Sequence, residues 1–132
     1  MAKWLVPCLC LIAAGAAACG EGYSRAEVRY NLGRELAADG DAESAIQEFD
    51  EAIRLDPAFT AAYYARGLSW LGAGDYRAAA RDLTAAIALD PGLAEAYRYR
   101  ITADMVTGNV DRAFSDSYLL AALYAGPGLV SQ

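Results

Sequence analysis

The chain contains no histidine, and its single lysine, Lys3, lies close to the N-terminus. Histidine is the commonest general base and metal ligand near neutral pH, so its absence argues against most hydrolase and metalloenzyme chemistry. The 132 residues carry 11 basic and 17 acidic side chains, a net charge of -6. Proteins that neutralise nucleic-acid phosphates need clustered basic residues. We therefore expect a protein without cofactors or metals that does not bind nucleic acid.

Proline is also scarce, with four residues in the whole chain. Hydrophobic residues make up 56% and charged residues 21% of the sequence, a balance that argues against disorder. Abundant alanine and little proline favour helices. The length suits one domain with its own core.

All three cysteines, Cys8, Cys10 and Cys19, lie within the first 19 residues. Residues 1–18 combine the positive charge of Lys3, an apolar stretch and a run of small residues before Cys19, which is the pattern of a signal peptide. The apolar run is shorter than the roughly 20 residues that span a bilayer as a helix. We expect cleavage before Cys19, which leaves a mature chain with one cysteine and no internal disulfide.

The segment Ala16-Ala17-Ala18-Cys19 resembles the lipobox of bacterial lipoproteins, although Ala16 stands where leucine is most common. The resemblance implies a diacylglycerol on the sulfur of Cys19, further acylation such as palmitate, and attachment to the membrane through this lipid. Because Gly20 and not aspartate follows the cysteine, a Gram-negative host implies the periplasmic face of the outer membrane. The same small residues suit an ordinary signal peptidase, so a soluble periplasmic or secreted protein is the alternative.

The rest of the chain repeats itself every 34 residues. Asp56-Pro57 recurs as Asp90-Pro91, and Gly40-Asp41 recurs as Gly74-Asp75. Small residues recur at the same spacing: Gly33 and Gly67; Ala45, Ala79 and Ala113; Ala52 and Ala86. This period and these residue types resemble the tetratricopeptide repeat family. The resemblance implies an all-α solenoid of three helix-turn-helix repeats, at 26–59, 60–93 and 94–127, between a short tether (19–25) and a tail (128–132).

Six helices are predicted, at residues 25–38, 42–54, 58–72, 76–89, 92–106 and 110–124. Ser24 and Glu27 fit a capping box that opens the first helix. Gly40 and Gly74 are expected to end helices in a left-handed conformation. Asp41, Asp75 and Asn109 are expected to cap the second helix of each pair, and Asp56 and Asp90 to cap the next helix with the following proline at its first position. Large apolar residues are expected to fill the core: Leu32, Leu36, Ile46, Phe49, Ile53, Trp70, Leu83 and Ile87.

The resemblance implies that partner peptides or helices bind in a groove lined by the first helix of each pair. Carried over position by position, the partner-binding candidates are Tyr30, Arg34, Tyr64, Leu68, Arg98, Thr102 and Met105. Members of the family that bind chaperone C-termini use a clamp of lysine, asparagine and arginine. The corresponding positions hold Tyr30, Arg34, Ala65, Glu95 and Tyr99, so this clamp is absent.

The third repeat departs from the pattern at Ile101, Asp104 and Ser117, and its last helix is apolar on more than one face. A homo-oligomer interface is therefore a second candidate surface, formed by Phe114, Tyr118, Leu120, Leu123 and Tyr124. Three readings follow. The first is a lipid-anchored adaptor that binds envelope proteins in its groove, and the second is an assembly subunit, for example of pilus, secretion or cell-wall machinery, that acts through the last helix. An enzyme is the weakest, because neighbouring carboxylates such as Asp50 and Glu51 lack any histidine partner.

Overall fold

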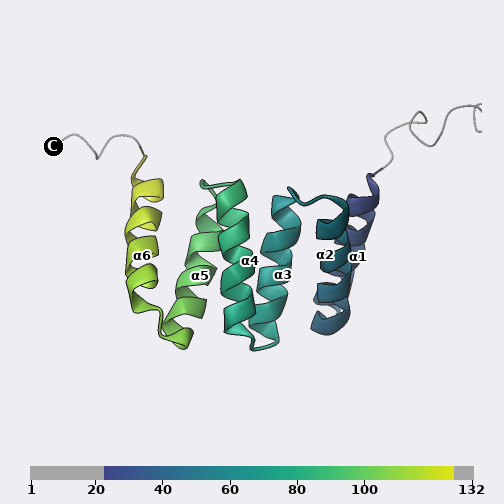
Figure 1. The fold of residues 1–132 in the computed structure, drawn as a ribbon, viewed down its shortest axis with the longest axis horizontal. Coiled ribbons are helices and arrows are strands. Elements are labelled where there is room, and N and C mark those ends of the chain that lie inside the picture. Colours follow the sequence, from purple (N-terminus) through teal and green to yellow (C-terminus); the bar gives the residue numbers. More distant parts are fainter. Residues whose placement is uncertain (1–22, 127–132) are drawn as a thin grey trace, which may run out of the picture.

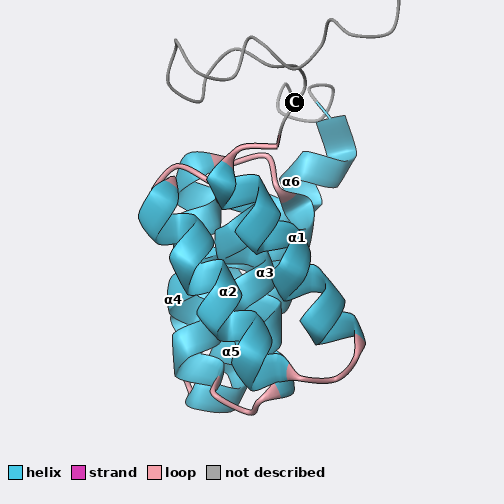
Figure 2. Cartoon of the chain, turned by 90° about the vertical axis from the view of Figure 1, so that its right-hand side faces the viewer, coloured by secondary structure: helices cyan, strands magenta, loops and turns pink. Residues whose placement is uncertain are grey.

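The computed structural model describes residues 23–126, and their regular structure consists of six helices in a row. In chain order these are α1 (Arg25–Ala38), α2 (Ala42–Leu55), α3 (Thr60–Gly72), α4 (Tyr76–Leu89), α5 (Ala94–Thr107) and α6 (Val110–Ala125). Figure 1 shows the row with α1 at one end and α6 at the other. Short loops join successive helices (Figure 2). The expected all-α array of three helix pairs is confirmed.

The first helix of each pair is followed, within two residues of its end, by a glycine in the left-handed region, with φ of +86° at Gly40 and +83° at Gly74 and Gly108. Only glycine adopts this conformation without strain, so these residues fix the tight turn into the second helix. The turn is followed by a capping aspartate in the first two pairs. Asp41 accepts a hydrogen bond from the Ser44 amide at 3.0 Å, and Asp75 accepts one from the Ala78 amide at 2.9 Å.

The capping box that opens α1 is confirmed by two reciprocal hydrogen bonds. The Glu27 amide donates to Ser24 Oγ at 3.2 Å, and the Ser24 amide donates to Glu27 Oε2 at 2.6 Å. The cap predicted at Asn109 is wrong. Its side-chain amide donates to Thr107 Oγ1 at 3.1 Å, so α6 begins without a side-chain cap.

The prediction that Asp-Pro starts the next helix is also wrong. Asp56 ends α2 in an extended conformation, and its Oδ1 accepts the amide of Ala58 at 3.0 Å. This aspartate turn uses the two residues after Asp56, and α3 therefore begins at Thr60 and not at 58. Asp90 repeats the arrangement with the Gly92 amide, and α5 begins at Ala94.

Small residues let the two helices of a pair approach closely. A Cβ built on Gly33 would lie 2.7 Å from Phe49 Cε1, and one on Gly67 would lie 3.1 Å from Leu83 Cγ. Phe49, Leu83 and Ile87 are buried, as predicted. Leu32 is 39% exposed, which corrects its assignment to the core. It lies on the first helix of the array, where no described helix precedes it.

Ion pairs between arginine and aspartate join neighbouring helices and recur from one repeat to the next. They were not predicted from the sequence. Arg66 binds both Asp82 oxygens at 2.7 Å and also Asp50 of the preceding pair at 2.5 Å. One repeat later, Arg100 binds both Asp116 oxygens at 2.6 Å and Thr84 Oγ1 at 2.9 Å. Each arginine therefore connects three helices.

Asp104 also has a structural role that the sequence analysis took for a loss of pattern. Its side chain is fully buried and accepts hydrogen bonds from Arg112, one of them at 2.6 Å. The carboxylate thus holds the beginning of α6 against α5.

Within residues 23–126, no helix is both long and apolar enough to cross a membrane.

Candidate functional site

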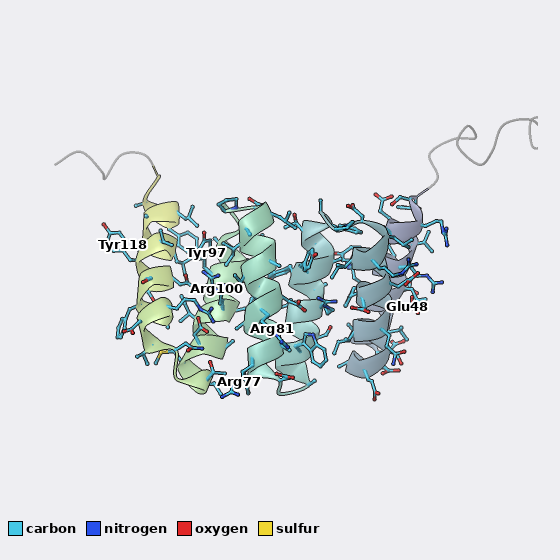
Figure 3. All side chains as sticks on the ribbon, in the orientation of Figure 1. Glu48, Arg77, Arg81, Tyr97, Arg100 and Tyr118 are labelled. Carbon is cyan, nitrogen blue, oxygen red and sulfur yellow. The ribbon has the colours of Figure 1, made fainter. Side chains whose placement is uncertain are left out.

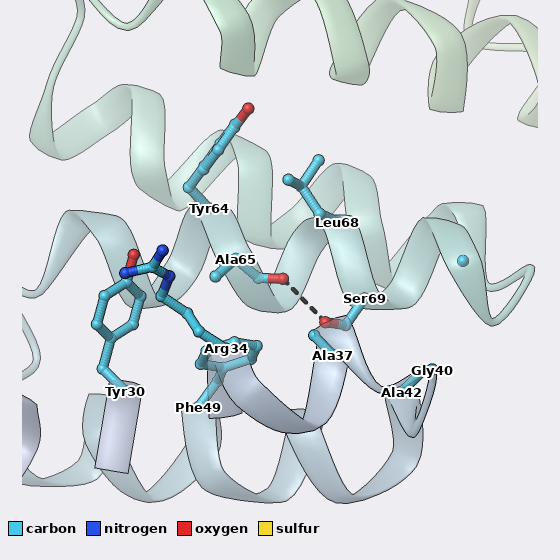
Figure 4. Close-up of a pocket in the computed structure, with 11 residues that line it drawn as sticks. Tyr30, Arg34, Ala37, Gly40, Ala42, Phe49, Tyr64, Ala65, Leu68 and Ser69 are labelled. Carbon is cyan, nitrogen blue, oxygen red and sulfur yellow. Dashed lines mark hydrogen bonds between the residues drawn. The ribbon is translucent and has the colours of Figure 1, made fainter. Parts of the chain in front are cut away.

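An open pocket lies between α1 and α3, with a volume of about 520 Å³ (Figure 4). The two helices form its walls, and residues of α2 close its floor. Small and apolar side chains supply most of the lining: Tyr30, Arg34, Ala37, Gly40, Ala42, Phe49, Tyr64, Ala65, Leu68, Ser69 and Gly72. A concave site with a few polar groups in an apolar lining is typical of ligand binding.

Tyr30 and Arg34 form the α1 wall. The Tyr30 ring packs in tilted geometry against Phe59 and Phe49, with centroids 4.9 Å and 5.8 Å apart, so its orientation is set by the core beneath it. The Arg34 guanidinium lies 5.8 Å from the centre of the Tyr30 ring, within cation–π range. Arg34 is exposed and forms no ion pair with any residue between 23 and 126. The pocket therefore carries an accessible positive charge beside an apolar floor.

Tyr64 and Leu68 lie on the α3 wall, and both are half-buried. The Tyr64 ring meets Tyr99 of α5 edge-on, at 6.2 Å between centroids. Burial raises the pKa of the Tyr64 hydroxyl above its ordinary value, and nearby Tyr99 and Glu95 add to the effect. The hydroxyl is therefore protonated at neutral pH and can donate a hydrogen bond.

The other three partner-binding candidates lie on α5, outside the lining of this pocket. Arg98 is ion-paired with Glu95 at 3.0 Å, and this carboxylate raises the pKa of the guanidinium. Thr102 Oγ1 donates to the Arg98 carbonyl at 3.2 Å, and Met105 is 57% exposed. The structure thus brings Tyr30, Arg34, Tyr64 and Leu68 together and leaves the α5 residues on the next helix along.

Sequence reasoning did not assign the pocket floor to the site. Phe49 was predicted as a core residue and Gly40 as a helix end, yet both also border the pocket. The signal was present in the repeat pattern, because Gly33 admits the Phe49 ring directly against the α1 backbone, where a Cβ would come within 2.7 Å of Phe49 Cε1.

The predicted interface on α6 divides into exposed and packed residues. Phe114, Tyr118 and Tyr124 are 72%, 79% and 66% exposed. Leu120 is half-buried and packs against the cluster around Leu83, so only part of its side chain is accessible to a partner. It occupies the inward-facing repeat position held by alanine in α2 and α4.

Leu123 is exposed for a reason unrelated to the end of the array. It is 41% exposed, and Leu89 at the same repeat position of α4 is 43% exposed. Since α4 lies inside the array, this position faces solvent in both repeats. The apolar surface specific to the end is therefore centred on Phe114 and Tyr118.

A second hollow of about 630 Å³ lies between α4 and α6 and is lined by Arg77, Arg81 and Arg112, among others.

Within the described part of the chain, no group of three histidine, cysteine, aspartate or glutamate side chains is placed to hold a metal ion. Cys19, the predicted lipidation site, lies outside the described residues.

Two family models match the chain: residues 33–71 match "TPR repeat", and residues 60–93 match "Tetratricopeptide repeat". Together they span the first two helix pairs from Gly33 onward. No curated protein matches the sequence.

Solved structures match over all three pairs. The second TPR domain of Spaghetti (RPAP3), bound to the HSP90 peptide SRMEEVD, is 27% identical with a TM-score of 0.72, and the match covers 76% of this chain and 93% of that one. MamA is 26% identical with a TM-score of 0.73, over 76% of this chain and 58% of MamA. The type III secretion translocator chaperone SycD of Yersinia enterocolitica shares the fold at 20% identity and a TM-score of 0.71, over 77% of this chain and 70% of its own length.

Proposed function

We propose that this chain, whose helix pairs are tetratricopeptide repeats, is a non-enzymatic adaptor that binds a partner protein in the pocket between α1 and α3. The observation that carries the proposal is the lining of that pocket. Its fixed aromatic wall, its apolar floor and a guanidinium that pairs with no carboxylate of residues 23–126 suit recognition of a peptide or helix. Aromatic and arginine side chains supply much of the binding energy at protein interfaces.

The chemistry of the pocket suggests the character of the partner segment. Phe49 and Leu68 offer apolar contact for a hydrophobic side chain, and Arg34 offers a charge for a carboxylate on the same segment. An arginine and a carboxylate form short, charge-assisted hydrogen bonds. We therefore expect a partner segment in which an acidic residue lies close to an aliphatic or aromatic one.

We do not expect this partner to be a chaperone C-terminus of the kind bound by the RPAP3 domain. The clamp positions of the first pair hold Tyr30 and Arg34, and Glu95 adds a negative charge in the third pair. Glu95 would repel the terminal carboxylate of such a peptide, and its neighbour Arg98 is already paired with it.

We further propose that the protein acts at the bacterial cell envelope, held there by a lipid on Cys19. Stable attachment requires more than one acyl chain, as mature lipoproteins carry. A tether of a few residues would keep the groove close to the membrane and raise the local concentration of a bound partner there. Soluble export remains the alternative if an ordinary signal peptidase processes the chain.

The groove can be tested by crosslinking and capture in the native host with the full chain. Arg34→Glu reverses the charge of an exposed side chain and is expected to reduce recovery of the partner by at least about tenfold, as the loss of a hot-spot arginine does. Arg81→Glu is the matched control, because Arg81 is also exposed and unpaired among residues 23–126 but lies on α4 outside this pocket. Equal capture by both variants and the wild type would contradict groove binding.

Anchoring is tested separately by fractionation of a Cys19→Ala variant. We expect wild type in the membrane fraction with a mass shift for the lipid, and the variant without either. If both proteins fractionate into the soluble periplasm, the lipid anchor is wrong, while the result of the capture experiment stands on its own.

A further inference from the structure

The array exposes two apolar faces, one at each end. The head face consists of Val28 and Leu32 on α1, which are 53% and 39% exposed. The tail face consists of Val110, Phe114 and Tyr118 on α6, which are 44%, 72% and 79% exposed. The two helices lie at opposite ends of the row (Figure 1), and the Tyr118 side chain projects outward from α6 (Figure 3).

Inside the array, the equivalents of these two faces lie against each other, with Ala80 at the position of Phe114 buried and Asp50 and Thr84 at the position of Tyr118 still exposed. Helix α3 packs on α2, and α5 packs on α4. The residues one and two repeats after Val28 are Ala62 and Ala96, and both are completely buried in these contacts. The face that α6 exposes is therefore the face on which a first helix packs within the array, and α1 is a first helix whose packing face is uncovered by residues 23–126.

Each internal junction contains a polar contact at one fixed pair of repeat positions. Arg66 of α3 donates to Asp50 of α2 at 2.5 Å, and Arg100 of α5 donates to Thr84 of α4 at 2.9 Å. At the position of these arginines, α1 has Leu32.

The position on α6 that corresponds to the hydrogen-bond acceptor of the internal junctions has also changed. Tyr118 of α6 occupies the repeat position of Asp50 and Thr84. The ends thus lack the arginine donor and the carboxylate or aliphatic hydroxyl acceptor. Leu32 is apolar, and Tyr118 presents an aromatic ring with a hydroxyl at its tip, so the leucine can pack on the ring.

We propose that the tail face of one copy of this chain binds the head face of a second copy, with Leu32 packed against Tyr118. The contact continues the stacking of the array from one molecule to the next. Because it joins two different faces, it is heterologous, and it produces open chains unless the rotation closes a ring. It goes beyond groove binding and does not depend on it.

Side-chain size sets the geometry expected at this junction. Val28 and Phe114 are larger than Ala96 and Ala80, their buried equivalents on the neighbouring helices α5 and α4. The helices of two copies therefore stand further apart than α4 and α5 do. A symmetric dimer of two tail faces would bury Phe114 and Tyr118 but leave the head face open, which is why a second copy in head-to-tail orientation is the proposed occupant.

Sedimentation of the full chain over a range of concentrations tests the proposal. Leu32→Arg and Tyr118→Asp each place a charge opposite an uncharged side chain of the second copy, and each is expected to weaken self-association by at least about tenfold. Leu89→Arg is the matched control. Leu89 is 43% exposed, close to the 39% of Leu32, but it lies on α4 and belongs to neither end face, so the variant should associate like the wild type. Residues 1–22 are the same in every variant, so any association that they cause is common to all.

Mixing the two variants separates head-to-tail stacking from the symmetric alternative. In the mixture the new arginine can meet the new aspartate, as Arg66 meets Asp50, so self-association should return. A symmetric tail-to-tail dimer predicts instead that Leu32→Arg has no effect and that mixing does not rescue Tyr118→Asp. Either that pattern, or a wild type that stays monomeric at every concentration, overturns the proposal. Circular dichroism of each variant confirms that the helices are retained.

Discussion

Helices α4 and α6 are both the second helix of a repeat, yet they differ sharply in burial. Seven residues of α4 are buried, including Leu83 and Ile87, whereas only Ala113 and Asp116 are buried in α6. The cause is position, because α5 covers α4 and no described residue covers the outer face of α6. Burial in this fold therefore depends on the neighbour as much as on the helix itself.

The two helices agree on the inner face and differ on the outer one. Asp82 of α4 and Asp116 of α6 are both buried and bound by an arginine. On the outer face, Thr84 is replaced by Tyr118. The aspartate of the inner face recurs in α4 and α6 because it binds an arginine on the first helix of the same pair. The residue on the outer face can differ in α6, because no described helix packs on it.

The largest expected effect comes from removing the ion pair on the inner face of α6. Asp116 is 2% exposed and binds Arg100, which is 7% exposed, so Asp116→Ala leaves a buried arginine without its carboxylate. Loss of one partner of a buried pair costs about 3–5 kcal/mol of the free energy of unfolding. Urea unfolding followed by circular dichroism measures it.

Asp50→Ala is the control for this prediction. Asp50 is exposed, and Arg66 keeps both hydrogen bonds to Asp82, so the loss should stay below about 1 kcal/mol. Similar losses in the two variants would show that the periodic ion pairs do not hold the pairs together.

A smaller effect separates the two leucines of α6. Leu120→Ala removes side-chain atoms that pack on the central core and should cost about 2 kcal/mol, at the lower end of the range for buried leucines because Leu120 is only half-buried. Leu123→Ala removes an exposed side chain and should change stability by less than about 0.5 kcal/mol. The same urea measurement compares them, and the reverse order would contradict the placement of α6.

The smallest effect sharpens the comparison at the helix start. Asp75 caps α4, whereas Asn109 donates to Thr107 and leaves α6 uncapped. Asn109→Asp removes that donor and supplies a capping carboxylate, so we expect a gain of about 0.5–1 kcal/mol in the free energy of unfolding at pH 7.

This gain should depend on pH in a defined direction. At Asp41, hydrogen bonding with Ser44 lowers the pKa of the capping carboxyl below its ordinary value. A cap with a lowered pKa stabilises above the unfolded value of about 3.9, and the stabilisation is lost as pH falls through the folded value. Thermal melts between pH 7 and pH 3 measure this loss. Asn109→Ser provides a neutral cap and should raise the free energy of unfolding without losing that gain at low pH. A gain in Asn109→Asp that does not depend on pH would contradict capping by the carboxylate.

The repeat period was sufficient to predict the helices and part of the core, since Phe49, Leu83 and Ile87 are buried while Leu36, Ile46, Ile53 and Trp70 are half-buried. Gly33, Gly40 and Phe49 have the roles that their repeat positions indicate, because close packing and tight turns accept few residue types. The sequence also showed Arg66 and Arg100 one period apart, and Asp82 and Asp116 likewise, but no rule of helix amphipathicity places such pairs inside. Their burial depends on three helices meeting, which only the assembled array shows.

The site was predicted in part for a similar reason. Family positions identified Tyr30, Arg34, Tyr64 and Leu68, which line one pocket, and equally Arg98, Thr102 and Met105, which do not. Position in a repeat says which face of a helix a residue occupies. It does not say whether a neighbouring side chain, such as Glu95 beside Arg98, already engages that residue.

The central claim is that a partner protein binds between α1 and α3, separately from the two ends of the array. It is tested most directly by crosslinked capture with the wild type, Arg34→Glu and Tyr118→Asp side by side. We predict that Arg34→Glu loses the partner and keeps self-association, whereas Tyr118→Asp keeps the partner and loses self-association. Recovery of the same partner by Arg34→Glu at undiminished yield would contradict the claim.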